Sequence, residues 1–231
     1  MKLHRFIADF EVSGSEILIK DRDIVKQIRN VLKLEIDEEV LLSDGKGDET
    51  HAKIKAIFSD KVICEILETK NIKQSGREVN LYLAILKKDN FELAVQKATE
   101  CGVSNIIPVI TERTIKTGLN TERLEKIVKE ASEQSGRSIV PKILETMELK
   151  EALQHGTKNE EKVIFHLVKE NYEPKKNVTT VSIFIGPEGG FTEKEINLAK
   201  ESGYEVASLG DLTLRGETAA IVATYRATQG I

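Results

Sequence analysis

Short apolar runs, separated by polar turn residues, make up the first seventy residues of the chain. Most of these runs are too short for helices, and one of them alternates apolar and polar positions as a half-buried strand does. Turn residues follow at 43–47 (Ser-Asp-Gly-Lys-Gly) and at 59–60 (Ser-Asp). The runs lie at 17–19, 40–42 and 62–67, and the alternating apolar positions are Ala52, Ile54, Ala56 and Phe58. Strands joined so tightly predict a small β-barrel.

One short segment of this region has helical spacing instead. Ile24, Ile28 and Val31 follow Asp21 at intervals that place them on one face of a helix. We therefore expect a short helix with these three side chains buried.

The pattern changes after a polar stretch without periodicity, Lys70 to Arg77, which we take as the domain boundary. Beyond it, strands and helices alternate, which predicts an α/β domain with a mainly parallel sheet over residues 71–231. Apolar runs predict strands at 81–86, 106–110, 163–167, 181–185 and 206–209. Helices are expected from Asp89 to Gly102, from Asn120 or Thr121, from Thr192 to Ser202, and from Glu217 to Thr228.

Two of these helices carry a sequence signal for their first turn. Asp89 is followed by Glu92, and Thr192 is followed by Glu195, which is the spacing of a capping box. Each pair predicts that the side chain of the first residue caps the helix.

Composition limits the possible partners. The chain has 34 Lys and Arg against 38 Asp and Glu, a formal net charge of −4, so binding to nucleic acid would need a local gathering of cations. Cys64 and Cys101 lack metal-ligand or disulfide-framework spacing, and we expect no metal. No stretch approaches the roughly 20 apolar residues that span a bilayer, and because the first six residues form no long apolar stretch we expect no signal peptide. We expect a soluble cytoplasmic protein without a membrane partner.

Two loops carry candidate chemistry, because ligands of parallel sheets bind beyond the carboxyl ends of the strands. One is Gly186-Pro187-Glu188-Gly189-Gly190, and the other runs from Gly210 to Ala220. Their glycines let a backbone approach a ligand closely. Neither loop fits GxGxxG or a Walker sequence, which favours a cofactor held by backbone groups without a phosphate anchor. The alternative is that both are ordinary turns.

Several separated motifs resemble the ribosomal RNA small subunit methyltransferase E family, and the resemblance covers essentially the whole chain. They are Ile185 to Thr192, Leu209-Gly210, Leu214-Arg215, Glu217 to Ala219, Lys97 to Val103, Glu112 to Thr114, Glu130 to Arg137, His4 to Phe6 and Asp44 to Gly47. The resemblance implies a PUA-like, RNA-binding barrel over residues 1–70. It also implies a SPOUT methyltransferase domain with a C-terminal trefoil knot over residues 71–231, and a homodimer.

The family resemblance further implies an activity, a partner and a cofactor. The activity is transfer of the methyl group of S-adenosylmethionine to N3 of a uridine, uridine 1498, in 16S ribosomal RNA, and the partner is that RNA or the small ribosomal subunit. The implied cofactor residues are Leu167, Gly186, Pro187, Glu188, Gly189, Gly190, Leu209, Gly210, Leu214, Arg215, Thr218 and Ala219. The implied RNA contacts are His4, Arg5, Arg113, Glu130, Gln134 and Arg137.

The chemistry adds a requirement, because N3 of uridine carries a proton and is a poor nucleophile until that proton is lost. An arginine near the base would stabilise the resulting anion, and a carboxylate would accept the proton only if it were desolvated. Arg215, Glu188 and Arg137 are therefore the candidate catalytic residues. N3 lies on the pairing edge, so the uridine must be unpaired or flipped out.

Plainer interpretations exist for several of these residues. The leucines are equally expected in the core, Arg215 and Glu217 would brace the loop as an ion pair, and Thr218 would cap the last helix. Glu130, Gln134 and Arg137 recur at i, i+4 and i+7, the pattern of a solvated helix face. The rival functions are a non-catalytic RNA-binding or assembly factor and a related knotted methyltransferase with another RNA target.

Overall fold

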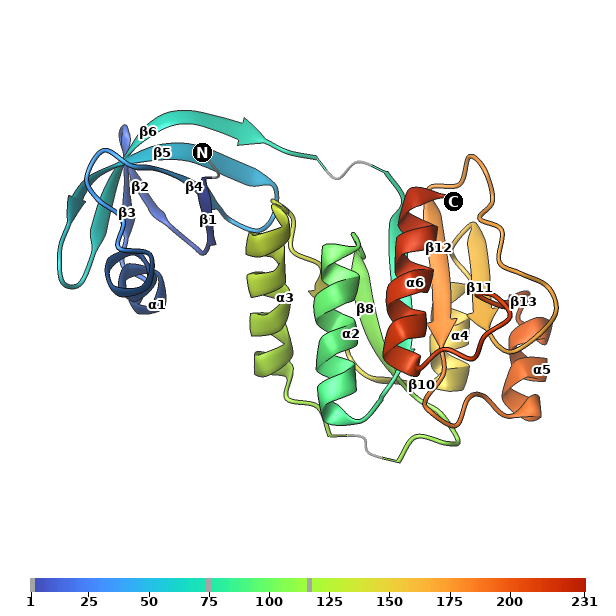
Figure 1. Cartoon of the computed structure of the whole chain (residues 1–231). Coiled ribbons are helices and arrows are strands. Elements are labelled where there is room, and N and C mark those ends of the chain that lie inside the picture. Colours follow the sequence, from blue (N-terminus) through green and yellow to red (C-terminus); the bar gives the residue numbers. More distant parts are fainter. Residues whose placement is uncertain (1–2, 74–75, 116–117) are drawn as a thin grey trace. The chain divides into compact units, whose positions relative to one another are not determined.

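The computed structural model describes residues 3–73, 76–115 and 118–231, which fold as two units (Figure 1). The first unit is formed by the described residues of Met1–Gln74 together with the segment Ser132–Val140. The second unit is formed by the described residues of Ser75–Ala131 and by Pro141–Ile231.

The first unit is a six-stranded sheet with the hydrogen-bonded order β1-β4-β5-β6-β3-β2. β1 pairs with β4 in parallel, and the other neighbours are antiparallel. Its core is aliphatic, with Phe6 as the aromatic side chain that is fully buried. Barrel closure stays a prediction. The strands are β1 (His4–Ile7), β2 (Glu11–Ser13), β3 (Glu16–Ile19), β4 (Glu39–Ser43), β5 (Asp48–Ile57) and β6 (Val62–Asn71).

The helix expected after Asp21 is present, but its buried face is shorter than predicted. Helix α1 (Arg22–Lys26) continues directly into a π-helical segment, η1 (Gln27–Leu32), and the Asp21 carboxylate accepts two backbone N–H groups at its start. Ile24 and Ile28 are buried, whereas Val31 is 68% exposed. A π-helix has more residues per turn than an α-helix, which carries Val31 off the buried face.

The alternation predicted over residues 52–58 also ends early. Ala52 and Ile54 are buried, but Phe58 is 45% exposed and lies beyond the end of β5. The pairing of β5 with β6 shifts register between Ile54 and Ala56. Because side chains alternate between the two faces of a strand, this shift ends the simple period of two.

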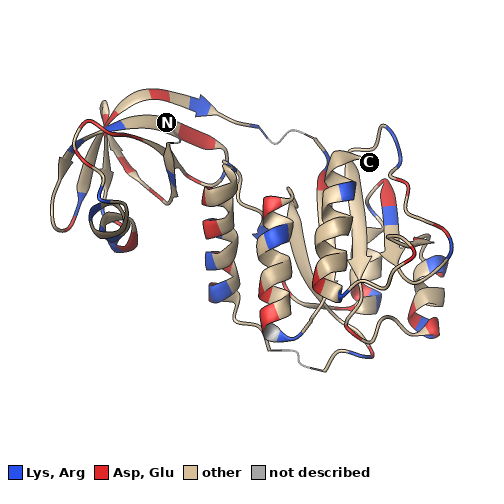
Figure 2. Cartoon of the chain, viewed as in Figure 1, with Lys and Arg blue, Asp and Glu red and all other residues tan. Residues whose placement is uncertain are grey.

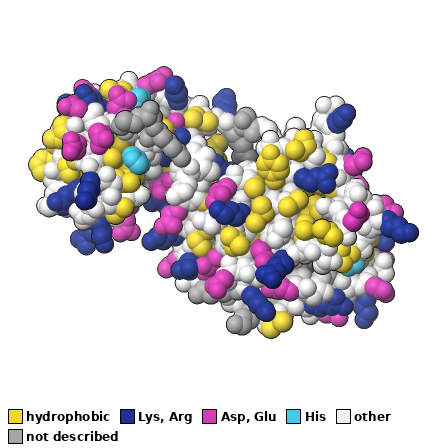
Figure 3. Space-filling view, in the orientation of Figure 1, with side chains coloured by type: hydrophobic (Ala, Val, Ile, Leu, Met, Phe, Trp, Pro, Cys, Tyr) yellow, Lys and Arg dark blue, Asp and Glu magenta, His cyan; other side chains and the backbone are white. Residues whose placement is uncertain are grey.

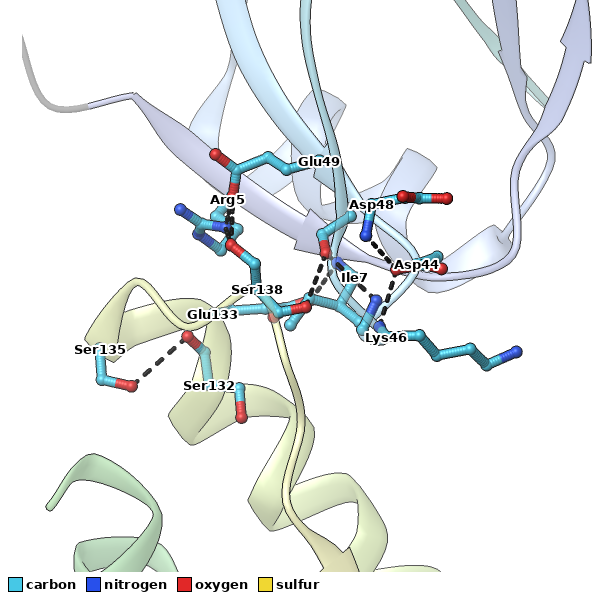
Figure 4. Close-up of polar contacts among 12 residues, drawn as sticks. Arg5, Ile7, Asp44, Lys46, Asp48, Glu49, Ser132, Glu133, Ser135 and Ser138 are labelled. Carbon is cyan, nitrogen blue, oxygen red and sulfur yellow. Dashed lines mark hydrogen bonds and ion pairs between the residues drawn. The ribbon is translucent and has the colours of Figure 1, made fainter. Parts of the chain in front are cut away.

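The segment Ser132–Val140 is held to the strands of the first unit by polar contacts (Figure 4). The backbone N–H of Ile7 donates to Glu133 Oε1 at 2.8 Å, and the Ser138 hydroxyl donates to Glu49 at 2.7 Å. The expected division at residue 70 placed this segment in the second domain. No turn or composition signal in the sequence indicates that it belongs with the first unit.

The second unit is built on a seven-stranded sheet with the order β10-β8-β7-β12-β11-β13, in which β9 also pairs with β8. Every pairing in it is parallel, which confirms the mainly parallel sheet. The strands are β7 (Glu78–Ala84), β8 (Asn105–Ile110), β9 (Lys142–Ile143), β10 (Met147–Glu148), β11 (Glu161–Phe165), β12 (Thr180–Ile185) and β13 (Glu205–Ala207).

Helices cover both faces of this sheet. The helices are α2 (Lys88–Glu100), α3 (Thr121–Ser135), α4 (Leu149–Gly156), α5 (Glu193–Glu201) and α6 (Gly216–Gln229). α2 and α6 lie side by side, with α6 against β7 and β12 (Figure 1). α4 and α5 bury Leu153 and Ile196 in one cluster with Tyr82 and Phe184 of the sheet.

The two predicted capping boxes had different outcomes. Thr192 caps α5 and forms the full reciprocal box with Glu195. The box at Asp89 was wrong, because the cap position lies two residues earlier, at Lys87, and has no side-chain cap. Glu92 instead forms a bidentate ion pair with Arg123 of α3, at 2.6 and 2.7 Å.

A buried polar layer joins α4 to the sheet at Gly156. The Ser182 hydroxyl donates to the carbonyl of Gly156 at 3.1 Å, and the Tyr204 hydroxyl donates to the carbonyl of Leu153 at 2.8 Å. A Cβ at position 156 would lie 2.3 Å from the Tyr204 hydroxyl oxygen and 2.9 Å from Ser182 Oγ. Position 156 therefore has no room for a side chain.

Gly156→Ala should lower the free energy of unfolding of the second unit by about 1–3 kcal/mol, the usual range for an overpacked core. All four tyrosines lie in this unit and the chain has no tryptophan, so tyrosine fluorescence during urea denaturation reports its unfolding. Gly118→Ala is the control, because its Cβ would meet nothing within 4 Å. Equal stabilities of the two variants would contradict the proposed packing.

Candidate active site

A cavity of about 640 Å³ lies at the carboxyl ends of β11, β12 and β13 in the second unit. The loops that follow these three strands form most of its wall, and the first turn of α6 and the start of α2 complete it. It is lined by Lys87, Asn90, Phe165, His166, Leu167, Ile185, Gly186, Pro187, Glu188, Gly189, Gly190, Phe191, Ser208, Leu209, Leu212, Thr213, Leu214, Arg215, Gly216, Glu217 and Ala219.

The loop after β12 is a tight turn that needs its glycines. The N–H of Gly190 donates to the carbonyl of Pro187 at 2.8 Å, and Gly190 has φ +68°, a left-handed conformation that favours glycine. A Cβ on Gly186 would press on the buried ring of Phe191 at 3.1 Å. This loop therefore exposes backbone groups to the cavity and leaves little room for side chains at Gly186.

The loop after β13 is held by a side-chain hydroxyl at its start. The Ser208 hydroxyl accepts from the N–H of Gly210 at 3.2 Å and donates to the carbonyl of that residue at 2.7 Å. Gly210 has φ +131°. Where the loop enters α6, a Cβ on Gly216 would lie 2.8 Å from Leu86. The start of α6 thus packs closely on the end of β7.

The leucines of the site are not core residues. Leu167 is 63% exposed and Leu212 is 80% exposed, although both line the cavity. Leu214 is half-buried. Their apolar surface faces the opening of the cavity, where a flat apolar group of a ligand would cover it.

Three charged side chains line the cavity in different environments. Glu217, in the first turn of α6, is only 7% exposed, whereas Glu188 and Arg215 are exposed. Glu188 Oε1 accepts the backbone N–H of Lys87 at 3.1 Å, next to the start of α2. Glu188 is therefore not desolvated, as a proton-accepting role would require.

The predicted bracing ion pair between Arg215 and Glu217 is wrong. Within the described part of the chain, neither side chain forms an ion pair. Thr218 does not cap α6 either, because Arg215 is at the cap position and Thr218 lies exposed inside the helix.

All the predicted cofactor residues except Gly210 and Thr218 line this cavity. Lys87 and Asn90, which follow β7, also line the cavity and were not among the expected cofactor residues. β7 pairs with β12, so the carboxyl ends of the two strands meet at one edge of the sheet. Polar residues directly after the apolar run at 81–86 could have indicated a part of the site. That inference needs the pairing of β7 with β12, which the sequence does not show.

The comparisons with known proteins agree on one family. A family model described as an RNA methyltransferase domain matches residues 73–228. The ribosomal RNA small subunit methyltransferase E of Rickettsia conorii is 32% identical over 96% of this chain and 94% of its own length. The protein of the same name from Aquifex aeolicus is 30% identical over 95% of this chain and 96% of its own length.

Solved structures agree with this result. The ribosomal RNA small subunit methyltransferase E from Neisseria gonorrhoeae, bound to S-adenosyl methionine, superposes with a TM-score of 0.86. It shares 31% identity over 96% of this chain and 95% of that chain. A putative methyltransferase from Legionella pneumophila, in complex with SAM, gives a TM-score of 0.84 at 28% identity over 97% and 96% of the two chains. This chain belongs to the ribosomal RNA small subunit methyltransferase E family.

In this family member, two predicted RNA-contacting residues of the second unit occupy different settings. Arg113 donates through its guanidinium to the carbonyl of Gly189 in the cavity loop, and a Cβ on Gly189 would lie 3.2 Å from Arg113 Cδ. Glu130 is exposed on α3, 3.9 Å from the ammonium of Lys126, and is not part of the cavity wall. Arg113 therefore holds the loop in place.

The remaining predicted RNA contacts belong to the first unit. Arg5 forms an ion pair with Glu49 and donates to the Ser138 hydroxyl at 3.0 Å (Figure 4). Arg137 Nε donates to the carbonyl of Ile139 at 3.2 Å, and burial lowers the pKa of this guanidinium from its usual value. Both arginines thus contact their own unit, whereas His4 and Gln134 are exposed.

Two general features of the described residues bear on the site. They contain no group of three or more His, Cys, Asp or Glu that could hold a metal ion. Across the same residues, every helix is too short or too polar to cross a membrane.

Arg113→Ala should loosen the loop after β12. Loss of a charge-assisted hydrogen bond of about 1.5 kcal/mol would speed opening of the loop about tenfold. Amide hydrogen exchange of residues 186–191, followed by mass spectrometry, measures this. Arg123→Ala is the control, because Arg123 bonds Glu92 on α2 instead. Unchanged exchange in Arg113→Ala would show that Arg113 does not hold the loop.

Proposed function

We propose that this chain transfers the methyl group of S-adenosylmethionine to N3 of a uridine, uridine 1498, in 16S ribosomal RNA. The observation that carries the proposal is the cavity at the carboxyl ends of the strands, formed by the loops that the family resemblance assigns to the cofactor. Its volume of about 640 Å³ lies within the range of about 300–1,000 Å³ of small-molecule sites.

The residues of the cavity fit the three chemical parts of S-adenosylmethionine. Leu209 and Leu214 supply apolar surface for the flat adenine ring, and the loop after β12 supplies backbone donors and acceptors for polar groups. Glu217 supplies a nearly buried carboxylate opposite a ligand that carries positive charge on sulfur. When bound, the cofactor supplies an electrophilic methyl group.

The protein's own contribution to the reaction is positioning and charge. Arg215 is exposed at the cavity and precedes α6 directly, where its guanidinium would stabilise the negative charge on the uracil oxygens after N3 loses its proton. Glu188 lacks the desolvation needed to accept that proton. Arg137 is held in the first unit by Ile139, which favours a structural role for it.

Three finer features are part of the same proposal: a PUA-like barrel in the first unit, a trefoil knot in the second and a homodimer. The last strand, β13, lies at the edge of the sheet, whereas the helix that follows it, α6, packs on the inner strands β7 and β12. This return of the chain end to the middle of the sheet supports the proposed knot. Leu93 on α2 and Tyr225 on the neighbouring α6 are 41% and 50% exposed. This apolar face favours a second copy of the chain as its partner.

Mass spectrometry of 16S ribosomal RNA from a strain that lacks this gene tests the reaction. We expect loss of one base methylation, at uridine 1498, and its return when the gene is restored. Loss of a methyl group elsewhere in RNA would favour the related methyltransferase with another target. If every methylation remained and calorimetry showed no binding of S-adenosylmethionine at high micromolar concentration, the chain would be a non-catalytic factor.

Glu217→Gln should weaken S-adenosylmethionine more than S-adenosylhomocysteine, because only the first ligand carries positive charge on sulfur. Removal of an attraction of about 1.4 kcal/mol raises the dissociation constant about tenfold, and we expect less than about a twofold change for the neutral sulfide. Calorimetry with both ligands measures the difference.

Glu188→Gln is the matched control, since its carboxylate lines the same cavity but is exposed. It should change the ratio of the two dissociation constants much less. An equal loss of affinity for both ligands in Glu217→Gln would mean that Glu217 shapes the cavity and does not recognise charge.

A further inference from the structure

A second hollow, of about 570 Å³, lies entirely in the first unit. Five cationic side chains and a single anionic one line it: Lys20, Arg22, Lys26, Arg29, Lys61 and Asp60. This excess of cations is local, because the chain as a whole has a formal net charge of −4. Figures 2 and 3 show Lys and Arg on the part of this unit where α1 lies.

The local structure brings these cations to one side. Arg22 and Lys26 lie four residues apart on α1, which places them on one face, and Arg29 of η1 lines the same hollow. Ile24 and Ile28 of the same segment are buried on the opposite side. The hydrophobic core of the first unit therefore fixes which face presents the arginines and lysines to solvent.

The turn between β5 and β6 forms the other wall of the hollow. Arg29 donates to the carbonyl of Ser59 at 3.2 Å, which ties η1 to this turn. Lys61 lies over the ring of Phe58, 5.1 Å from its centroid, and Phe58 is 45% exposed. Lys61, which lines the hollow, is thus next to a partly exposed aromatic ring.

Arg22 and Lys26 are the cations most available to a ligand. Lys20 is paired with Glu11 at 2.7 Å, and Arg29 is held by Ser59. Arg22 and Lys26 are exposed and form no ion pair with any residue that the structure describes. Their guanidinium and ammonium groups are the donors that phosphate oxygens accept from.

We propose that this hollow binds the phosphate backbone of the RNA substrate. Lysine and arginine contacts to phosphates supply most of the sequence-independent affinity for nucleic acid. The exposed ring of Phe58 beside Lys61 provides a surface on which an unpaired base stacks. This inference rests on the proposed function for its ligand, and it moves the RNA contact of the first unit from Arg5 to the face of α1.

The test compares two full-length variants of equal charge. Arg22→Glu with Lys26→Glu cancels the net positive charge of the residues that line the hollow, and Lys46→Glu with Lys70→Glu makes the same charge change elsewhere. Lys46 and Lys70 lie near the Asp48–Asn71 end of the β5–β6 pair, whereas the hollow lies at the Ile57–Val62 end. At about 3.3 Å per residue, the two ends of β5 are roughly 30 Å apart.

We expect the hollow variant to bind a 16S ribosomal RNA transcript at least about tenfold more weakly in about 0.1 M salt. Its plot of log affinity against log salt should be shallower by about 1.4–1.8, because each of the two lost phosphate contacts removes about 0.7–0.9 from the slope. The control variant should stay within about twofold of the unchanged protein. Arg22→Lys with Lys26→Arg, which keeps both charges, should retain the affinity.

Calorimetry with S-adenosylmethionine separates this proposal from the proposed function. Unchanged cofactor binding with lost RNA binding in the hollow variant supports the hollow as the RNA site. If the hollow and control variants bind RNA equally well, the inference is wrong, whether or not the cofactor binds. Loss of binding to phosphatidylglycerol vesicles alone, with RNA binding intact, would also overturn it. Absence of cofactor binding in the unchanged protein would instead contradict the proposed function.

Discussion

The parallel direction of every strand in the second unit determines where its chemistry is possible. Because β11, β12 and β13 run the same way, their carboxyl ends meet at one edge of the sheet, and the three loops that follow them face one another. Reversal of one strand would carry its loop to the opposite edge and open the cavity. The glycines then let the loop after β12 turn tightly, because Gly186 leaves room for the ring of Phe191 and Gly190 adopts a positive φ.

Features set by neighbouring residues could be predicted from the sequence. The capping box of Thr192 and Glu195 needs only residues within one turn, and the two cavity loops follow directly from the strands before them. The pairing of β7 with β12 joins segments about a hundred residues apart, and hydrophobic periodicity carries no information about it. For the same reason Lys87 and Asn90 were missed, although the strand before them was expected.

Charge alone does not show which cations are already bonded, because their partners can lie far away in the sequence. Arg5 is bonded to Glu49, Arg113 to the carbonyl of Gly189, and Arg123 to Glu92. A sequence shows that a side chain is cationic but not whether another part of the fold has already satisfied it. A distant strand also changed the outcome for Phe58. The period of two placed its side chain with the buried positions of the strand, but a register shift against β6 leaves it exposed.

The local placement of unpaired cations matters for how an acidic chain can bind RNA. The attraction that net charge exerts on a distant RNA is largely screened beyond the Debye length, about 8 Å at physiological salt. At shorter distances, binding depends on which cations remain unpaired and on which face of the protein they lie. Of the arginines named here, those bonded inside the fold add rigidity, whereas Arg22 stands exposed with Lys26 on a helix face that the core orients outward. The distribution of ion pairs, which only the fold reveals, therefore decides the proposed RNA-binding surface more than the composition does.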